Sequence, residues 1–549
     1  MGLKKDQQTA LDCCLSGKNV FISGGGGVGK TYLVHEIVEK LGQQGCEVML
    51  TAPTGRAAQL IGGATCHRAF RIPLKMAWDK DPKPRDLDHL FVTDTVIIDE
   101  ISMVRMDVFG YIFRCIQKAN HVREKNGKPP IQLIVVGDFF QLPPVIVTPK
   151  DGSIGDADLM SRHYGFDVGN GYAFQAPEWA ACGFTVCELR EVVRQKDGAM
   201  ISMLNRLRYG DASVLSDIQH ATRKKPYSAK EKNVVHLCGK KKTADAINRA
   251  SLNRLGGPEI TYKAVIQGTV GENDKPAPEQ IHLRAGAHVM MLVNTDDYVN
   301  GSTGTVVHLG EDSVHVQLNN DEQTVVSVEY ASWDVTTYEK GSDGRVRLKV
   351  IGWYSQLPLR PAYAITIHKS QGQTLEKAVL CVGKTGAEIF AEGQLYVGAS
   401  RITNLANLYI KGELQGIKRL TSQKVIDYYN SIGITFDPAQ DISPKVADQE
   451  DEIPAQKKKK SRRARPRKGD APAVIEQNRD PEPKKQAEKA GEKRVRIAVT
   501  ALQRPVIMAF AQVLDPGAYT DGSSVAVTEG WADTVKDFLA KLYHAEVPG

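Results

Sequence analysis

The sequence predicts an α/β protein with two parallel-sheet lobes, a small β-barrel inserted in the second lobe, a polar linker and a small C-terminal domain. Three observations favour this architecture. Short β-branched runs alternate with helical stretches, the alternation starts again near Phe184, and a two-residue period interrupts it between 296 and 358. A chain of 549 residues is long enough for three or four such domains.

The first lobe is expected over residues 1–183. Its strands are expected in four apolar runs: NVFIS (19–23), EVMLTA (47–52), TVIIDE (95–100) and IQLIVVGD (131–138). Continuous apolar runs between helical stretches are typical of a parallel sheet with both faces covered. The second alternation predicts a second lobe over 184–295 and 359–437.

The interruption at 296–358 has the pattern of antiparallel strands. In TGTVVHLGEDSVHVQL (303–318), Val314, Val316 and Leu318 alternate with polar residues after a Gly-Glu-Asp turn. A two-residue period across a turn predicts an antiparallel hairpin. We therefore expect a small β-barrel inserted in the second lobe.

The chain after residue 437 is expected to fall into two parts. Residues 438–493 are rich in charged residues and proline and poor in apolar ones, so we expect a disordered basic linker. Residues 494–549 regain apolar runs, in VIMAFAQVL (506–514) and the amphipathic WADTVKDFLAKLYH (531–544). These runs predict a small accessory domain of unknown function, whose protein partner stays open.

Composition excludes several classes of protein. The formal net charge is +7, but 457–468 (KKKKSRRARPRK) carries nine cations, so the rest of the chain gives no basic signature. The nine cysteines show no zinc-ligand spacing, and no run is long enough to span a membrane. We expect a protein without membrane contacts, in the cytoplasm of a bacterial or viral system or in a eukaryotic nucleus.

The residues Gly24 to Thr31, GGGGVGKT, form a phosphate-binding loop between a strand and a helix. Gly27 and Gly29 let backbone N–H groups close around a phosphate, and the helix N-terminus favours the negative charge. Lys30 is expected to reach the β- and γ-phosphates, and Thr31 to offer its hydroxyl to Mg²⁺. The pattern predicts that ATP and Mg²⁺ bind here.

Two further segments fit the same chemistry. The strand VIIDE ends in Asp99 and Glu100, which predicts a metal ligand followed by a residue that orients the attacking water. GDFFQLPPV (137–145) delivers Gln141 into a proline-fixed loop, where it could sense the γ-phosphate. The acids are also compatible with helix capping, and Gln141 with a stiffened turn.

Eight motifs in order carry a resemblance to a known family. Besides GGGGVGKT and GDFFQLPPV they are TAPTGRAA (51–58), ATCHRAF (64–70), VIIDEISM (96–103), EVVRQ (191–195), AITIHKSQGQT (364–374) and LYVGASR (395–401). This order resembles superfamily 1 helicases, in particular the petite integration frequency family of 5′-to-3′ DNA helicases. MVRMDVFGYIFRCI (103–116) is similar to that family's signature segment. The resemblance spans roughly residues 3–412.

The resemblance implies two RecA-like lobes, an inserted SH3-like barrel and ATP-driven translocation on single-stranded DNA. It implies that Gln7 reads adenine, although Gln8 beside it is a second candidate. It also implies that Arg194 and Arg401 reach the γ-phosphate from the second lobe. Fixed arginine donors would stabilise charge on the transferred phosphoryl group and couple hydrolysis to lobe closure.

Single-strand contacts are implied for the motif loops of both lobes. Short hydroxyls and imidazoles suit phosphate oxygens and hold a strand without reading its sequence. Each residue is also compatible with a helix cap or a turn. The candidate residues are Pro53, Thr54, Thr65, His67, Thr366, His368 and Ser370.

The implied partners are single-stranded DNA and forked or structured DNA, bound by a monomer. Two other readings stay open: a DNA-stimulated ATPase switch that does not unwind, and a helicase subunit of a recombination nuclease. The basic segment 457–468 is compatible with a non-specific nucleic-acid arm, a solvated linker or a nuclear address.

Overall fold

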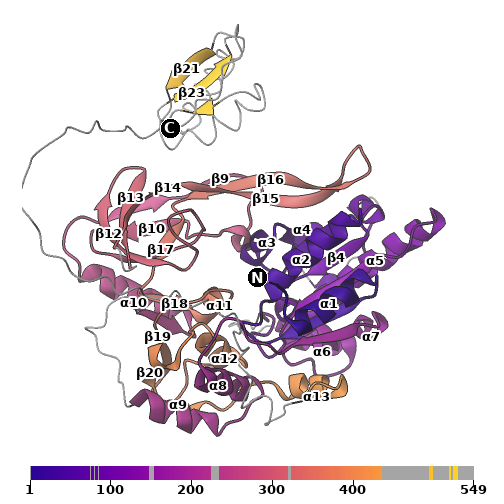
Figure 1. Cartoon of the computed structure of the whole chain (residues 1–549), viewed down its shortest axis with the longest axis horizontal. Coiled ribbons are helices and arrows are strands. Elements are labelled where there is room, and N and C mark those ends of the chain that lie inside the picture. The colour runs from indigo at the N-terminus through magenta and orange to yellow at the C-terminus, as the bar shows by residue number, and fades with distance from the viewer. Residues whose placement is uncertain are drawn as a thin grey trace, which may run out of the picture. The chain divides into compact units, whose positions relative to one another are not determined.

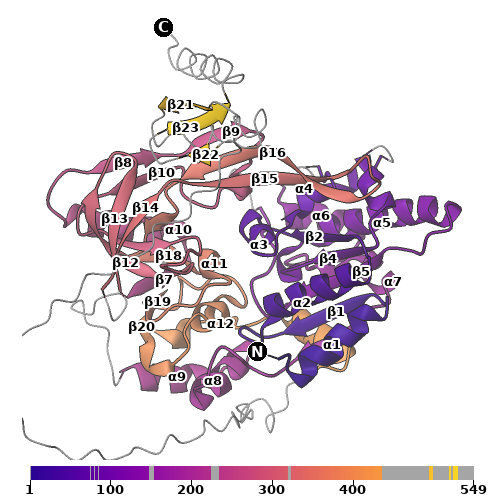
Figure 2. The same ribbon diagram turned by 45° about the horizontal axis from the view of Figure 1, so that its top comes forward.

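The computed structural model describes residues 2–73, 76–79, 81–83, 86–147, 154–223, 234–319, 323–435, 494–498, 519–520 and 524–528. The chain divides into two units, residues 1–447 and 448–549. Figures 1 and 2 show the first unit as two lobes with a β-rich insert above the second. No helix of the described part is long and apolar enough to cross a membrane.

The first lobe is built on a six-stranded parallel sheet in the order β3-β2-β4-β5-β1-β6. On β1, Val20 and Ile22 face one core, and Phe21 faces the other. The predicted parallel sheet with two covered faces is confirmed. The strands are β1 (Val20–Gly24), β2 (Val48–Ala52), β3 (Ala64–Thr65), β4 (Thr95–Ile98), β5 (Gln132–Gly137) and β6 (Thr185–Leu189).

Helices cover both faces of this sheet. The core on one side contains residues of α1 (Lys5–Leu15), α2 (Lys30–Gln43) and α3 (Gly55–Leu60). The core on the other side contains residues of α4 (Cys66–Ala69), α5 (Met106–Lys125), α6 (Asp156–Tyr164) and α7 (Pro177–Ala181). The predicted boundary at 183/184 is wrong, because β6 pairs with β1 and completes the first sheet.

The second lobe has a four-stranded parallel sheet in the order β18-β7-β19-β20. Its main core joins α8 (Gly198–Arg208), α9 (Val214–Arg223) and α12 (Gln394–Ala399) to this sheet. α10 (Lys241–Asn253) contributes to a smaller core with β7, β18 and β19. The strands are β7 (Val235–Cys238), β18 (Ala364–Thr366), β19 (Ala378–Gly383) and β20 (Leu408–Gly412), and α11 (Ile367–Ser370) follows β18.

The insert is larger than predicted and runs from Ile260 to Pro361. The predicted hairpin is confirmed, since β12 (Thr303–Leu309) pairs antiparallel with β13 (Ser313–Leu318). It lies in a five-stranded sheet, β14-β13-β12-β11-β17, and β8 and β10 pair beside it. The start was misplaced because β11 is buried along its whole length and shows no alternation. The remaining strands are β8 (Ile260–Lys263), β10 (Gln280–Leu283), β11 (His288–Met291), β14 (Val325–Glu329) and β17 (Leu359–Pro361).

A long hairpin reaches from the insert to the first lobe, and the sequence did not predict it. β15 (Ala331–Lys340) and β16 (Val346–Gln356) form this arm, with β9 (Val265–Gly268) at its base. Figures 1 and 2 both show the arm crossing above the first lobe. Tyr338 Oη accepts from Leu50 N at 3.0 Å and donates to Leu50 O at 3.1 Å, which fixes the arm to β2.

Helix α13 (Gln423–Ser431) returns to the first lobe, so the predicted end of the second lobe at 437 is wrong. Tyr429 is 1% exposed and stacks on Phe140. Its hydroxyl lies 2.8 Å from Ser23 Oγ and accepts from Phe139 N at 3.2 Å. Helix α13 is thus attached to β1 and to the residues that follow β5.

The second unit is described in three strands: β21 (Arg494–Ala498), β22 (Tyr519–Thr520) and β23 (Ser524–Thr528). They form an antiparallel sheet with β23 in the middle. The expected linker 438–493, its basic segment 457–468 and the runs 506–514 and 531–544 lie outside the described residues.

Replacing Tyr429 with alanine should lower the free energy of unfolding of the first unit by about 3–5 kcal/mol, as for other buried aromatic residues. Urea unfolding followed by tryptophan fluorescence would measure the change. Tyr32→Ala, at a side chain that is 43% exposed, is the matched control and should change the value by about 0.5 kcal/mol or less. Equal effects of the two changes would contradict the packing of α13.

Candidate active site

The loop Gly24–Thr31 connects β1 to the N-terminus of α2, as the sequence predicts. Gly27 and Gly29 have φ values of 93° and 80°, a left-handed conformation that favours glycine. A Cβ on Gly29 would lie 2.7 Å from Gln7 Nε2, and one on Gly27 would lie 2.6 Å from Gln195 Oε1. Both positions therefore favour glycine for conformation, and Gly27 also for space, because a Cβ there would lie 2.8 Å from Arg194 Cβ.

Lys30 is the first residue of α2 and turns back over the loop. Its Nζ donates to Gly24 O at 2.8 Å and Gly25 O at 3.0 Å. Burial lowers the pKa of this amine, because desolvation disfavours its charged form. An anion beside Lys30 would offset that cost, which suits a phosphate ligand.

The acidic pair follows β4 at the same edge of the sheet. Asp99 is 4% exposed, and burial, with the neighbouring Glu100 carboxylate, raises the pKa of Asp99 to about 7. No ion pair of the described residues involves Asp99, and none of their acid, histidine or cysteine clusters could hold a metal alone. Mg²⁺ commonly takes one or two carboxylates plus substrate phosphates, so the buried Asp99, whose charge acts on Lys30 of the phosphate loop, fits such an ion.

Glu100 is tied to the second lobe through a residue that the sequence analysis did not single out. Gln371 Nε2 donates to Glu100 Oε2 at 3.0 Å and to Gln141 Oε1 at 3.4 Å. Glu100 itself has φ 53°, which is uncommon for a residue other than glycine, asparagine or aspartate. The predicted water-orienting acid and the predicted phosphate sensor therefore meet at one amide of the second lobe.

The two predicted arginines also meet beside the phosphate loop. Arg194 Nη1 donates to Ser400 O at 3.4 Å, and Arg401 Nη2 donates to Ser400 Oγ at 2.7 Å. A Cβ on Gly26 would lie 3.6 Å from Arg401 Nη2. Burial, with the neighbouring Arg194 charge, lowers the pKa of Arg401 to about 9. This desolvated positive charge is suited to a phosphate oxygen.

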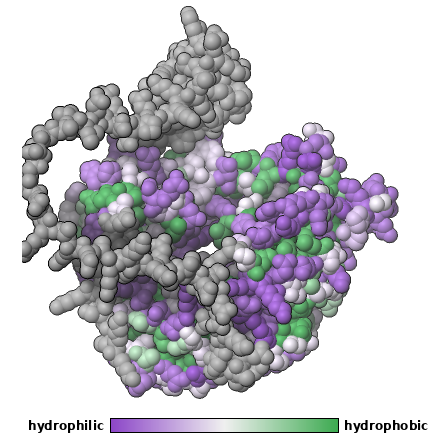
Figure 3. Space-filling model, viewed as in Figure 1, coloured by the Kyte–Doolittle hydropathy of each residue, from purple (hydrophilic) through white to green (hydrophobic). Residues whose placement is uncertain are grey.

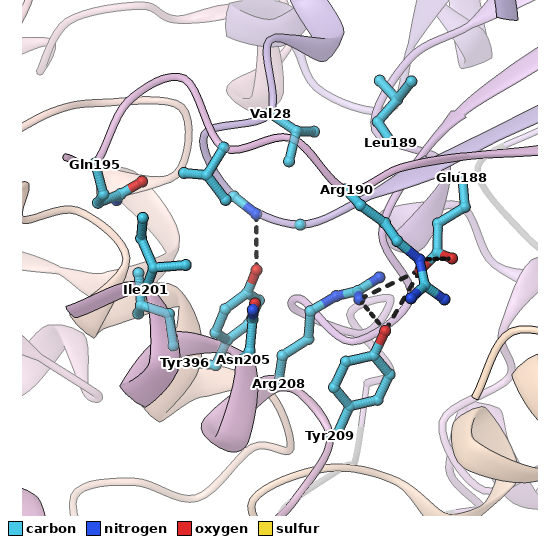
Figure 4. A pocket seen from close by; sticks show the side chains of 14 residues that line it. Val28, Glu188, Leu189, Arg190, Gln195, Ile201, Asn205, Arg208, Tyr209 and Tyr396 are labelled. Atoms are coloured by element: carbon cyan, nitrogen blue, oxygen red, sulfur yellow. Dashed lines mark hydrogen bonds and ion pairs between the residues drawn. The ribbon is translucent and has the colours of Figure 1, made fainter. Parts of the chain in front are cut away.

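A buried ion pair joins the lobes behind the loop. Asp138 is fully buried, and Arg208 of α8 donates to its carboxylate from Nε and Nη2 at 3.2 Å. Figure 4 shows Tyr396 of α12 beside Arg208, with its hydroxyl directed at the backbone of the loop. Its hydroxyl accepts from Gly26 N at 2.7 Å and donates to Asp138 Oδ2 at 3.4 Å.

Gln7, not Gln8, lies against the phosphate loop. Gln7 is 4% exposed, and its Nε2 donates to Val28 O at 2.9 Å. Its Oε1 accepts from Lys4 N at 2.9 Å, whereas the exposed Gln8 bonds to Asp12. The geometry favours Gln7 of the two, and its role in reading adenine stays a prediction.

The predicted strand-binding residues fall into two groups. Thr54 and Thr366 accept from the backbone N–H of Ala57 and Lys369 and so cap α3 and α11, beside a half-buried Pro53. His67 is exposed, and His368 is half-buried with its ring stacked 6.4 Å from that of Phe390. These positions leave side chains within reach of a ligand.

Thr65 and Ser370 do not fit the prediction as well. Thr65 is 7% exposed, and Ser370 is fully buried with its Oγ donating to Ile367 O at 2.8 Å. Thr65 ends β3 just before α4, and Ser370 ends α11, and motif spelling does not reveal that these side chains are buried. On the face in Figure 3, hydrophobic patches are scattered among hydrophilic residues.

The strand-binding segments of the two lobes adjoin each other. Arg56 of α3 donates to Lys369 O of α11 at 3.2 Å and to Asn300 Oδ1 of the insert at 2.9 Å. The sequence analysis missed this arginine, although it lies inside TAPTGRAA. It also missed Asp138, Gln371 and Tyr396, which lie inside quoted motifs, whereas Arg208 lies in none of them.

Comparisons with known proteins agree with this arrangement. The family model described as PIF1-like helicase matches residues 2–164. The chain is 32% identical to ATP-dependent DNA helicase PIF1 of Danio rerio, over 74% of this chain and 61% of that protein. It is 30% identical to ATP-dependent DNA helicase Pif1 of Campylobacter jejuni, over 73% of this chain and 90% of that protein.

Solved structures are similar as well. Pif1 of a Bacteroides species in complex with ADP-AlF4 gives a TM-score of 0.66 at 30% identity, over 79% of this chain and 98% of that chain. Pif1 helicase of Candida albicans gives 0.57 at 29% identity, over 79% and 100%. Relatives of this identity and coverage establish that the chain belongs to the PIF1-like helicase family.

Proposed function

We propose that this protein is an ATP-dependent DNA helicase that moves 5′ to 3′ on single-stranded DNA and unwinds duplex or structured DNA. The observation that carries the proposal is the link from Gln371 of the second lobe to Glu100 and Gln141 of the first. This link joins Glu100, the acid proposed to orient the attacking water, to the segment 366–371 that is proposed to contact single-stranded DNA. The relatives' names, ATP-dependent DNA helicase, support the activity.

In this proposal the phosphate loop and Lys30 bind the β- and γ-phosphates, and Gln7 contacts the adenine. Thr31 and Asp99 hold Mg²⁺, which when bound neutralises phosphate charge. Glu100 orients the attacking water and accepts its proton. Gln371 keeps the Glu100 carboxylate in place, because its amide donates to that oxygen.

Arg401 of the second lobe and Arg194 of the connection between β6 and α8 complete the site. Both guanidinium groups are desolvated beside the loop, where fixed donors stabilise developing negative charge most strongly. The approach of Arg401 requires the lobes to be seated on each other, so hydrolysis is coupled to opening and closing.

Strand movement follows from the two sets of gripping loops. Pro53, Thr54 and His67 serve the first lobe, and Thr366 and His368 serve the second. Thr65 and Ser370 shape the short helices beside them, since both are buried. α11 carries His368 and leads directly into Gln371, which bonds to Glu100. One segment of the second lobe therefore contacts both the DNA strand and the water-orienting acid.

Single-stranded and forked DNA are the proposed partners. Related Pif1 structures are described as bound to single-stranded DNA and at forked double-stranded DNA, which supports the assignment. The basic segment 457–468 is proposed to add non-specific affinity through phosphate contacts.

Replacing Glu100 with glutamine should slow DNA-stimulated ATP hydrolysis by about 10²–10⁴-fold, because only the proton-accepting group is lost. Affinity for fluorescent ADP should stay within a few fold. Steady-state phosphate release and equilibrium titration would measure the two quantities. Lys30→Ala is the contrasting variant and should lose nucleotide affinity, and loss of affinity in Glu100→Gln would identify Glu100 as a ligand instead.

Replacing Arg401 with lysine keeps the charge but removes the guanidinium fork. Turnover should fall by about 10³-fold, the scale of an arginine finger, with ADP affinity little changed. The control is Arg249→Lys at an exposed ion pair with Glu259, where turnover should not change. An unchanged rate in Arg401→Lys would show that the second lobe does not complete the site.

Strand displacement should occur on duplexes with a 5′ single-stranded tail and not on matched duplexes with a 3′ tail. The assay compares both substrates at the same ATP and protein concentrations. A preference for the 3′ tail would reject the proposed direction. DNA-stimulated ATP hydrolysis without displacement of either substrate would identify a switch or remodeller instead.

A further inference from the structure

Tyr396 is a buried second-lobe residue whose hydroxyl bonds to the phosphate loop. It lies on α12, five positions before Arg401, and is 3% exposed. A Cβ on Gly25 would lie 3.1 Å from its hydroxyl, so the loop backbone and the ring approach closely. Nothing in the proposed chemistry of ATP hydrolysis yet uses this side chain.

The hydroxyl of Tyr396 bridges two first-lobe segments. It accepts from Gly26 N at 2.7 Å, and it donates to Asp138 Oδ2 at 3.4 Å. Burial raises the pKa of Tyr396, so the hydroxyl keeps the proton that this arrangement requires. One donor and one acceptor of a neutral phenol are both used.

Two other side chains, Arg208 and Gln141, also meet the Asp138 carboxylate. Arg208 donates to both of its oxygens, and Gln141 Nε2 lies 3.5 Å from Oδ2. The Arg208 guanidinium lies 4.8 Å from the centre of the Phe140 ring, which holds it against the first lobe. A shift of α12 relative to this carboxylate would therefore change the hydrogen bonds of Gly26, of Gln141 or of both.

We propose that Tyr396 is a positioning residue that couples the seating of the second lobe to the conformation of the phosphate loop. When α12 is seated, the hydroxyl fixes the Gly26 amide and orients the Asp138 carboxylate beside Gln141. When α12 moves away, the loop loses this support. The inference rests on the proposed ATP hydrolysis and assigns to Tyr396 the response of that reaction to DNA.

The test is Tyr396→Phe, which removes the hydroxyl alone. With single-stranded DNA, kcat should fall by about three- to tenfold, the range expected for one lost hydrogen bond. KM for ATP and affinity for fluorescent ADP should change less than about twofold, because Lys30 still serves the phosphates. The ratio of DNA-stimulated to basal turnover should fall, which a purely structural role would not predict.

Tyr262→Phe is the matched control. Tyr262 is also 3% exposed, and its hydroxyl donates to Gly310 O at 2.7 Å, but it lies in the insert. Both variants should lose similar thermal stability, whereas Tyr262→Phe should keep the stimulation ratio. Tyr396→4-aminophenylalanine, whose aromatic amine donates well but accepts poorly, should recover only the part of kcat that depends on the bond to Asp138.

The outcomes separate the inference from the proposed function. Wild-type protein without DNA-stimulated ATP hydrolysis would reject the function, and the inference with it. A normal wild type beside an unchanged or faster Tyr396→Phe would overturn the inference alone. So would an equal loss of stimulation in Tyr262→Phe.

Discussion

The ion pair between Asp138 and Arg208 is the constraint on which the rest of the site depends. Removing one partner of a buried pair typically costs about 3–5 kcal/mol, because the other charge stays desolvated. Here the partners come from different lobes, and Arg208 also lies over the Phe140 ring. The pair therefore favours one register between α8 and the end of β5. Gln141 and Tyr396 are positioned by the same pair, because both bond to the Asp138 carboxylate.

The charges around the phosphate loop are arranged for an anionic ligand. Burial lowers the pKa values of Lys30, Arg194 and Arg401, and it raises that of Asp99. Each pKa shift arises because the charged form of the side chain is buried and its lost hydration is not fully replaced by opposite charges nearby. An anion among the three cations and a cation beside Asp99 would offset these costs together. The same cations come from both lobes, so ligand binding and lobe seating favour each other.

The sequence was sufficient for four of the six parallel strands of the first lobe and for the phosphate loop between β1 and α2. Those features are local: a glycine-rich turn, an apolar run, a polar residue at its end. It was insufficient for β6, α13 and the arm, because their partners are distant in sequence. Tyr338 bonds to Leu50 across 288 positions, and no local period encodes that pairing. Arg208 was missed for the same reason, since its role depends on an ion pair with Asp138, which lies 70 positions earlier in the sequence.

Several connections beyond the ion pair hold the lobes in register, and three of them involve the arm, Arg56 and α13. The arm is bonded to β2 through Tyr338, Arg56 reaches from α3 to α11 and the insert, and α13 carries Tyr429 back beneath β1. Two of them end close to the functional segments, since Arg56 lies inside a strand-binding motif and Tyr429 bonds to Ser23 just before the phosphate loop. A displacement of the insert would therefore act on the strand-binding loops through Arg56, whereas a displacement of α13 would act on the phosphate loop. The strand-binding loops are thus connected to the insert through Arg56, and the phosphate loop is connected to α13 through Tyr429. Gln371 lies between the two sets of residues, since it follows α11 and bonds to Glu100 and Gln141.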